Sequence, residues 1–521
     1  MLFRLYFIYL FGVSTALEIV TKKIKMKKIL LLILGLLATC AIFGQNHWSH
    51  TWKQFNHHTP ALDYVGTLAT PPADGSGHSL WSVGCETLDR DYAVFANYKE
   101  YLSELGVGYA RIQSGWAKTE QKKGKYDYKW LDPVVDGIIE EGLKPWMTLC
   151  YGNPIYGDSK GLGAQIFTDE VSVEAWKKYV EATVKRYKGK VVAYEIWNEP
   201  NLASGVNTPQ MYADLLIVTG EVIRRVDPQA KIITFALAGT VYNRVVKYVD
   251  EAMAHIAKAG KLDLIDYVSI HGYYTNPDES RYLISEMMKT ARSYIPDVKF
   301  IQGEAGCPAH LEWTHALKYL EWSEYSQAKW DARRMACDYS MGLPASIFTF
   351  VDLKYVNMQQ SFGLLRANLL GEVIYKRPAW HAVQNMAAIL TADTFIDETI
   401  SASVETGKSY LSVGLKDKDG NPRGVMVYFN GNPPTDTMVR DLCNVTVNGI
   451  AFKDPVYVEP ITGKVLQLVK NRGCEMPGYT KFYDLPLWDS PVFIMEKDAV
   501  VLQNDAINHQ TVGGTVKESM F

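Results

Sequence analysis

The chain has 521 residues, of which 47% are hydrophobic and 21% are charged, with 18 Phe, 13 Trp and 32 Tyr. This length corresponds to about three average domains, and the composition excludes a disordered, collagen-like or polytopic membrane protein. A net charge of -3 and a pI near 6.4 give no basic surface for nucleic acid, and seven cysteines are too few for a disulfide scaffold.

Residues 1–45 have the composition of an export signal. They carry six basic residues and one acidic residue, so that 48 basic and 56 acidic residues remain without them, a net charge of -8. Lys27-Lys28 precedes an apolar run over 29–43, which suits a secretory signal with its roughly 7–15 apolar residues better than a membrane span of about 20. We expect cleavage near Gly44-Gln45 and no stable membrane span after processing.

The segment before this run leaves alternatives open. An earlier apolar run covers residues 5–17, and Met26 stands directly before Lys27. We interpret Met26 as the true start and residues 1–25 as a misassigned extension, with a two-span membrane anchor as the alternative. Cys40 follows a loose lipoprotein-like sequence in which Thr39 fits poorly. The predicted protein is therefore exported: periplasmic, secreted or lipid-anchored at the bacterial cell surface.

Residues 46–76 are predicted to be an irregular lead-in, and residues 77–392 alternate short apolar runs with longer amphipathic ones, the pattern of repeated βα units. The eight predicted strands are 81–85, 109–113, 144–151, 191–197, 231–236, 267–271, 299–303 and 346–351. The predicted helices are 91–105, 131–141, 172–187, 209–225, 245–259, 279–294 and 330–341. Eight such units predict an α/β fold, a (β/α)8 TIM barrel. An open doubly wound sheet is the alternative, but no glycine-rich dinucleotide motif follows the first strand.

Residues 393–502 change to short alternating segments separated by turn residues, a pattern typical of antiparallel sheets. The predicted strands here are 409–415, 424–429, 456–460, 465–469 and 491–496. We therefore expect a C-terminal β-sandwich accessory domain, followed by a polar tail over 503–521.

Two glutamates lie where predicted barrel strands end. Asn198 and Glu199 follow the fourth strand, and Glu304 closes the seventh. The carboxyl ends of barrel strands form the face that carries active sites, so both carboxylates are expected on one rim. The residues around Glu304 are small and are expected to leave room for a ligand: Gly303, Ala305 and Gly306.

Paired carboxylates are what glycosidic cleavage requires. One carboxyl protonates the leaving oxygen, and the other, when the two are about 5–5.5 Å apart, attacks the anomeric carbon so that configuration is retained. The alternative for each glutamate is a solvated loop carboxylate without a catalytic role.

Asn-Glu-Pro at 198–200 and the glutamate ending the seventh strand resemble clan A of the glycoside hydrolases. The segments 360–365 and 376–381 resemble the closing loop and last helix of family 39, with family 5 and related barrels as alternatives. The resemblance implies that Glu199 is the acid/base, that Glu304 is the nucleophile and that Asn198 holds the sugar 2-hydroxyl. It implies cleavage of β-glycosidic bonds through a covalent glycosyl-enzyme, with no cofactor.

Three further positions fit the same site. His271 and Tyr273 are two residues apart on the sixth strand and so share one side. By the resemblance, the Tyr273 hydroxyl keeps Glu304 ionised and His271 binds substrate; Tyr274 replaces Tyr273 if the strand is shifted by one, and plain packing in the barrel wall is the alternative. Arg111 lies in an apolar run and needs an anion, for which Glu304 is the natural partner and a helix acid the alternative.

Sugar contacts are expected from Glu86, Trp116 and Tyr151, because the C–H faces of sugars pack against flat aromatic surfaces; ordinary packing is the alternative. Many clan members carry a tryptophan on the eighth strand. This chain has Phe348 and Phe350 there, and either could replace it.

Other chemistries find less support. His57, His58 and His78 lack metal-ligand spacing, so no metal site is predicted. Three cysteines near strand ends have no activating base and are predicted to be buried thiols: Cys85, Cys150 and Cys307. Pairing of Cys443 with Cys474 is left open.

The predicted function is a retaining glycoside hydrolase that acts on oligo- or polysaccharides. The alternative is a non-catalytic carbohydrate-binding protein on a glycosidase-like barrel. A lyase on the same barrel lacks a metal-ligand triad. The expected partner is a carbohydrate substrate and not nucleic acid.

Overall fold

The computed structural model describes residues 62–71, 79–156, 170–202, 208–468, 473–476 and 478–503. The chain divides into two units, residues 1–61 and 62–521, and the described residues all belong to the second. The predicted export signal, its alternatives, the three histidines without metal spacing and nearly all of the predicted tail lie outside the described residues. Within the described ranges, no helix has the length and apolar character needed to cross a membrane.

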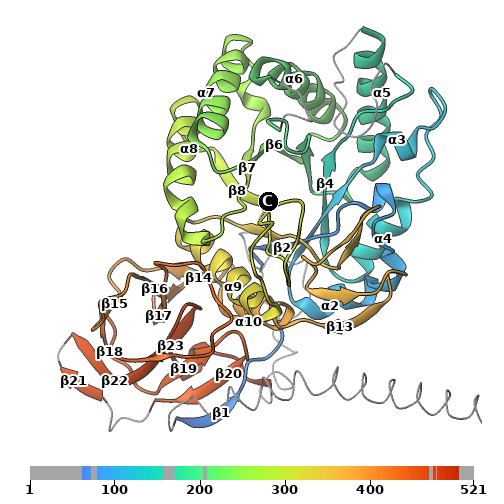
Figure 1. Ribbon diagram of the computed structural model, residues 1–521. Helices are drawn as coiled ribbons and strands as arrows, with labels where there is room; N and C mark the ends of the chain where they lie inside the picture. Colours follow the sequence, from blue (N-terminus) through green and yellow to red (C-terminus); the bar gives the residue numbers. More distant parts are fainter. Residues whose placement is uncertain are drawn as a thin grey trace, which may run out of the picture. The chain divides into compact units, whose positions relative to one another are not determined.

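Eight parallel strands close into a barrel, so the predicted TIM barrel is confirmed (Figure 1). Almost every strand residue is buried, because side chains face either the barrel interior or the surrounding helices. The barrel closes where β9 pairs with β2. The strands are β2 (Trp81–Gly84), β3 (Tyr109–Gln113), β4 (Lys144–Leu149), β5 (Ala193–Ile196), β6 (Lys231–Ala238), β7 (Tyr267–His271), β8 (Lys299–Ala305) and β9 (Ala345–Ile347).

Amphipathic helices surround the barrel (Figure 1). They are α2 (Leu102–Leu105), α3 (Trp116–Thr119), α4 (Asp132–Glu140), α5 (Glu170–Tyr187), α6 (Pro209–Val226), α7 (Tyr242–Lys258), α8 (Ser280–Tyr294), α9 (Glu324–Ser340) and α10 (Pro378–Ile389). The helix predicted over 91–105 is replaced by short 3-10 turns that lead into α2. Thr87 and Asp91 both adopt left-handed φ angles here, 68° and 57°, which interrupt a continuous helix.

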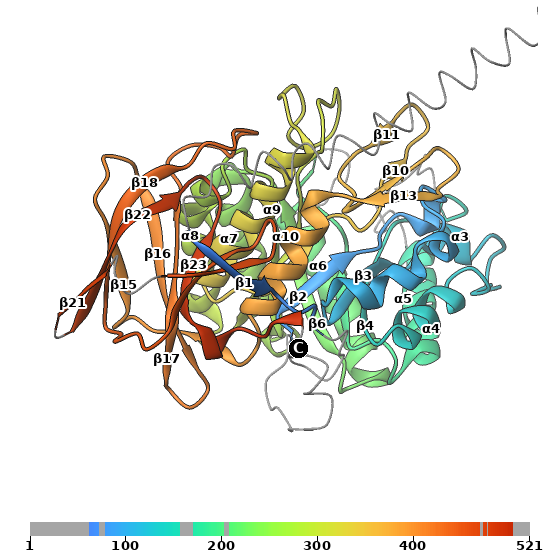
Figure 2. The same cartoon turned by 90° about the horizontal axis from the view of Figure 1, so that it is seen from below.

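Two antiparallel sheets form the predicted β-sandwich. The seven-stranded sheet has the order β1-β20-β19-β23-β17-β16-β14 and the four-stranded sheet the order β15-β18-β22-β21. Figure 2 shows the two sheets face to face, with the seven-stranded sheet on the side of α9 and α10. The strands are β1 (Asp63–Thr67), β14 (Thr394–Ile396), β15 (Ser401–Val404), β16 (Tyr410–Asp417), β17 (Pro422–Phe429), β18 (Asp441–Asn448), β19 (Pro455–Glu459), β20 (Lys464–Gln467), β21 (Gly473–Met476), β22 (Tyr479–Leu487) and β23 (Val492–Glu496).

Strand β1 was not predicted, because it lies inside the supposedly irregular lead-in. It joins the sheet as an edge strand, with Asp63 opposite Gln467 of β20. Its side chains are exposed or half-buried, so no hydrophobic alternation marks it in the sequence. The chain therefore contributes to the β-sandwich both before and after the barrel.

Two small hairpins follow β9 at the carboxyl end of the barrel. The first pairs β10 (Leu353–Lys354) with β11 (Gln359–Gln360), and the second pairs β12 (Leu365–Ala367) with β13 (Val373–Lys376). In the β domain, Cys443 is buried on β18, while the side chain of Cys474 lies outside the described residues, so their pairing stays open.

Candidate active site

The two glutamates line one cavity of about 420 Å³ at the carboxyl end of the barrel. Glu304 lies within β8. Glu199 follows β5 after a sharp turn, in which Trp197 and Glu199 have left-handed φ angles of 66° and 51° and the Glu199 amide donates to Ala236 O at 3.1 Å. One oxygen of each glutamate and Nδ1 of His271 all lie within 4.8 Å of one another. The strand ends thus bring both predicted carboxylates together.

Arg111 on β3 links most of the acidic groups of the site. It is fully buried, and its Nη1 donates to Glu304 Oε2 at 2.5 Å and to Glu86 Oε1 at 2.9 Å. Its Nη2 donates to Glu195 Oε2 at 2.6 Å and to Asn198 Oδ1 at 2.8 Å. The ion pair with Glu304 that the sequence suggested is therefore present, and no helix acid takes its place.

Tyr273 holds the other oxygen of Glu304. Its hydroxyl donates to Glu304 Oε1 at 2.7 Å, whereas the Tyr274 side chain does not line the cavity. Burial by itself would raise the pKa of Glu304, but the charges of His271 and Arg111 and the hydrogen bonds from Tyr273 and Arg111 lower it. Glu304 is accordingly an ionised carboxylate at neutral pH, as an attacking group must be.

His271 is fully buried and lies close to the carboxylates of both Glu199 and Glu304. Its Nδ1 lies 3.1 Å from Glu199 Oε1 and 3.7 Å from Glu304 Oε2. Burial lowers its pKa, but the charge on Glu304 and the contacts with the Glu195 and Glu199 carboxylates raise it overall to about 9. Because the ring is fully buried and absent from the cavity lining, the structure gives His271 a positioning role towards Glu199, and the predicted substrate contact has no surface to act through.

The same three residues are the donor set that a metal ion would use: Glu199, His271 and Glu304. The Arg111 guanidinium, 2.5 Å from Glu304, would repel a cation bound there. The donor set therefore suits proton transfer better than metal binding.

Glu195 belongs to this cluster although the sequence analysis did not select it. It is fully buried on β5 and accepts hydrogen bonds from Arg111 and, at 2.6 Å, from Thr148 Oγ1. Burial would raise its pKa, but Arg111 and His271 lower it to about 2. A charged residue inside the apolar strand was the signal that identified Arg111, and it applies equally to Glu195.

Glu86 and Tyr151, two of the predicted sugar contacts, line the cavity. Tyr151 Oη accepts from Asn198 Nδ2 at 2.8 Å, which orients the amide. Burial raises the pKa of Glu86 to about 7, with Arg111 opposing this rise and the charge on Glu304 adding to it. Glu86 is thus a third carboxyl of the cavity, and it changes charge near neutral pH.

Trp116 does not reach the cavity, which corrects the predicted sugar contact. Its indole is buried, with Tyr156 and Tyr179 stacked at 5.4 and 5.6 Å, and its Nε1 donates to Glu120 Oε2 at 2.6 Å. Both ring faces are therefore covered, and no sugar can stack on it. On the eighth strand, Phe348 lines the cavity, while Phe350 packs against Trp380.

The small residues beside Glu304 serve close packing and not ligand space. A Cβ on Gly303 would lie 2.2 Å from Ser269 Oγ and 3.1 Å from Glu195 Oε1, inside the barrel. A Cβ on Gly306 would lie 1.6 Å from the carbonyl oxygen of Phe348. A side chain at Gly303 would displace buried side chains of the cluster, and one at Gly306 would collide with backbone, so both glycines are explained by packing.

Loops after the strands supply the remaining wall, and sequence patterns did not mark them. Arg90 lies with its guanidinium carbon 5.3 Å from the Tyr151 ring and donates to Gln113. Other lining residues come from the loops after β8 and β9: His315, Ala316, Tyr355, Gln360 and Phe362.

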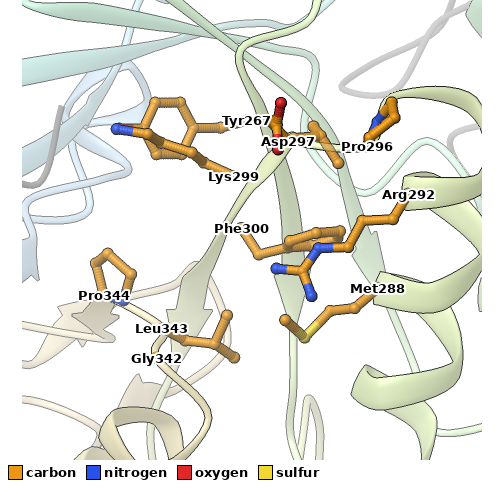
Figure 3. A pocket seen from close by; sticks show the side chains of 11 residues that line it. Tyr267, Met288, Arg292, Pro296, Asp297, Lys299, Phe300, Gly342, Leu343 and Pro344 are labelled. Atoms are coloured by element: carbon orange, nitrogen blue, oxygen red, sulfur yellow. The ribbon is translucent and has the colours of Figure 1, made fainter. Parts of the chain in front are cut away.

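A separate cavity of about 580 Å³ lies at the opposite end of β7 and β8 (Figure 3). There the Arg292 guanidinium lies over the Phe300 ring at 5.2 Å, and Asp297 is the single carboxylate among the described lining residues. Without a carboxylate pair, this cavity does not match the chemistry of the catalytic end. The three strand-end cysteines are buried free thiols, as predicted.

Comparison with known proteins agrees with this geometry. A model described as glycosyl hydrolases family 39 matches residues 99–307, which include both glutamates. The aryl-phospho-beta-D-glucosidase BglA of Bacillus subtilis (strain 168) is 24% identical over 221 residues. The aligned part covers 39% of this chain and 43% of that protein, so the chain spans less than half the length of this curated relative.

Solved structures share the fold over most of the chain. A family 39 glycoside hydrolase from Bacteroides cellulosilyticus WH2 aligns with a TM-score of 0.58 and 20% identity, covering 81% of this chain and 82% of that one. A monomeric beta-xylosidase from Caulobacter crescentus CB15 aligns with a TM-score of 0.52 and 17% identity, covering 83% and 98%. The matching family model and the site that it spans make residues 99–307 similar to family 39 of the glycoside hydrolases, and the solved structures show the same fold.

Proposed function

We propose that this protein is a retaining glycoside hydrolase that cleaves β-glycosidic bonds of oligo- or polysaccharides by double displacement. The observation that carries the proposal is the proximity of Glu199 and Glu304, which have oxygens within 4.8 Å of each other. Retaining enzymes keep their carboxyl groups about 5–5.5 Å apart, whereas inverting enzymes need about 6.5–9.5 Å to admit a water molecule.

In the first step, Glu304 attacks the anomeric carbon while Glu199 transfers its proton to the glycosidic oxygen. The carbon–oxygen bond to the leaving group breaks, and a glycosyl ester on Glu304 forms. Loss of the proton leaves a carboxylate on Glu199 beside the cationic His271, 3.1 Å away, which stabilises the new charge. As Glu304 gives up its own charge, Arg111 and Tyr273 hold its oxygens in place.

In the second step, Glu199 removes a proton from water, and the resulting oxygen nucleophile attacks the anomeric carbon and releases Glu304. The sugar leaves with its original configuration, and both glutamates return to their starting state. In this mechanism Asn198, which is hydrogen-bonded to both Arg111 and Tyr151, binds the sugar 2-hydroxyl, a bond that strengthens in the transition state.

The substrate and the site of action form part of the proposal. Resemblance to family 39 makes xylosides and uronic-acid glycosides the first substrates to test, and resemblance to family 5 adds glucans and mannans. The charged and apolar pattern of residues 1–45 supports export from the cytoplasm. A panel of aryl glycosides and polysaccharides would identify the sugar.

A 2-fluoro glycoside tests the mechanism, because fluorine slows the second step and traps the ester. We expect mass spectrometry to find one covalent sugar on the peptide that contains Glu304, and none in Glu304→Gln. Saturable binding of glycans without turnover or adduct would instead identify a non-catalytic carbohydrate-binding protein.

A further inference from the structure

We propose that Trp313 and Tyr319 form an aromatic platform at the mouth of the catalytic cavity, which binds pyranose units beyond the one that reacts. The proposal rests on the glycosidase function above and assigns the class of substrate: a glycan chain of several units, and not a single sugar with a small aglycone.

The first observation is exposure. The side chains of Trp313 and Tyr319 are 67% and 61% exposed, and their rings meet edge to face with centroids 6.3 Å apart. Large aromatic residues contribute most to stability when they are buried, so two adjacent exposed rings provide contact area for something outside the fold. Sugar rings offer flat C–H faces that suit such a surface.

The second observation is continuity with the catalytic cavity. Both rings belong to the loop between β8 and α9, and the same loop lines the cavity through His315 and Ala316. The His315 ring lies 4.5 Å from the ring of Tyr355, another lining residue. Trp313 and Tyr319 therefore stand two and three residues along the chain from the lining residues His315 and Ala316, so we infer that a glycan longer than the cavity reaches them.

The third observation is that the loop is held in one arrangement. The Tyr319 amide donates to Glu312 O at 2.8 Å, Trp322 Nε1 donates to Leu317 O at 3.0 Å, and Thr314 Oγ1 donates to Met358 Sδ at 2.8 Å.

Within this loop, three non-glycine residues have left-handed φ angles: His315 at 68°, Leu317 at 56° and Tyr319 at 64°. Such angles cost roughly 1 kcal/mol each, so the hydrogen bonds must offset them. A hydrogen-bonded backbone lowers the entropic cost of presenting the two rings to a ligand.

The experiment compares Trp313→Ala with the wild type on substrates of increasing length. The first series of probes is 4-nitrophenyl β-D-xyloside and β-1,4-xylo-oligosaccharides of two to six units. The second series is 4-nitrophenyl β-D-glucoside and β-linked gluco-oligosaccharides of the same lengths. We expect kcat/KM for the aryl glycoside to be unchanged and kcat/KM for the longer oligosaccharides to fall about three- to ten-fold. Trp313→Phe should lose less kcat/KM on the longer oligosaccharides than Trp313→Ala does, because it keeps an aromatic ring.

Tyr64→Ala is the matched control, since Tyr64 is equally exposed but lies on β1 of the β domain. Equal losses on short and long substrates, or no loss on either, would overturn the platform while leaving the glycosidase function intact. If none of these substrates is cleaved, binding of soluble xylan and β-glucan by affinity electrophoresis decides the question. If Trp313→Ala then binds these glycans more weakly than the wild type, the platform is supported although the glycosidase function is not. If the two proteins bind equally, or neither binds, the platform is overturned.

Discussion

Two fully buried arginines in this molecule have opposite surroundings. Arg333 on α9 donates to Asp278 Oδ2 at 2.7 Å, to Asn276 Oδ1 at 2.5 Å, and to the carbonyl oxygens of Asn430 and Asn432 in the β domain at 3.2 and 2.7 Å. The second oxygen of Asp278 accepts from Tyr428 Oη at 2.8 Å. One cation thus meets one carboxylate, and this cluster joins the barrel to the β-sandwich.

Arg111 instead meets three carboxylates, those of Glu86, Glu195 and Glu304. Within the described part of the chain, Glu86 Oε2 is buried without a hydrogen-bond partner, and Glu195 Oε1 and His271 Nε2 lie 3.9 Å apart as an ion pair that is too long for a hydrogen bond. Unpaired buried polar atoms cost free energy, and no side-chain atom of Arg333, Asp278 or Asn276 is among those in the described residues.

The difference shows how burial of charge serves two purposes. A balanced, fully hydrogen-bonded cluster stabilises one arrangement, as Arg333 does. An acid-rich cluster beside a cavity keeps groups that can gain or lose charge during a reaction, as around Arg111. Variants of both clusters should therefore separate loss of activity from loss of stability.

The largest expected effect follows removal of the attacking carboxylate. Glu304→Ala should lower kcat by a factor on the order of 10⁴–10⁶, because the proposed mechanism forms the glycosyl ester on this carboxylate. Azide at high concentration should restore part of the turnover and give a glycosyl azide of inverted configuration, detectable by NMR. Turnover near the wild-type rate would refute the nucleophile assignment.

Removal of the proton donor should have a smaller effect that depends on the leaving group. Glu199→Gln should lower kcat/KM about 10²–10⁴-fold for unactivated oligosaccharides, and much less for a dinitrophenyl glycoside, whose leaving group needs no proton. A plot of log kcat/KM against leaving-group pKa should be steeper for Glu199→Gln than for the wild type. Equal slopes would assign the acid to another residue.

Removal of Arg333 should lower the stability of the protein and leave its activity unchanged. Arg333→Met leaves the buried Asp278 carboxylate without its cation and should cost about 3–5 kcal/mol of stability. At a temperature where the variant remains folded, its kcat should match that of the wild type. Denaturant unfolding and kinetics at 20 °C measure the two effects separately, and a lost kcat in folded protein would show that the interface cluster influences the catalytic end.

The sequence predicted the centre of the site better than its walls, for physical reasons. Glu199, Glu304 and Arg111 were recognisable because strand ends and buried charges are tied to the regular βα pattern. Trp116 was misplaced because a sequence does not tell whether an aromatic ring after a strand turns to solvent or to the core. Edge strand β1 and the loop that carries His315 are held by hydrogen bonds to neighbouring backbone. Their side chains show no hydrophobic periodicity, so the sequence does not reveal these two segments.

The smallest expected effect concerns Glu86, whose charge depends on pH. Its pKa is raised to about 7 in the folded protein, against an ordinary value of 4.5. Between these values the folded state keeps a proton that the unfolded chain has released. The stabilisation is therefore complete below pH 4.5 and is lost as pH rises through about 7. Glu86→Gln resembles the protonated form and cannot ionise, so it removes this pH dependence.

We expect Glu86→Gln to have the same thermal midpoint as the wild type near pH 4.5 and a higher one at pH 8, where the gain in stability is on the order of 3 kcal/mol. Glu221→Gln, on the exposed side of α6, is the control and should shift nothing. If both variants follow the wild type at every pH, Glu86 behaves as an ordinary ionised acid. The cluster around Arg111 would then hold three permanent carboxylates, and its contrast with the balanced cluster around Arg333 would lie in the number of charges and not in their ability to change.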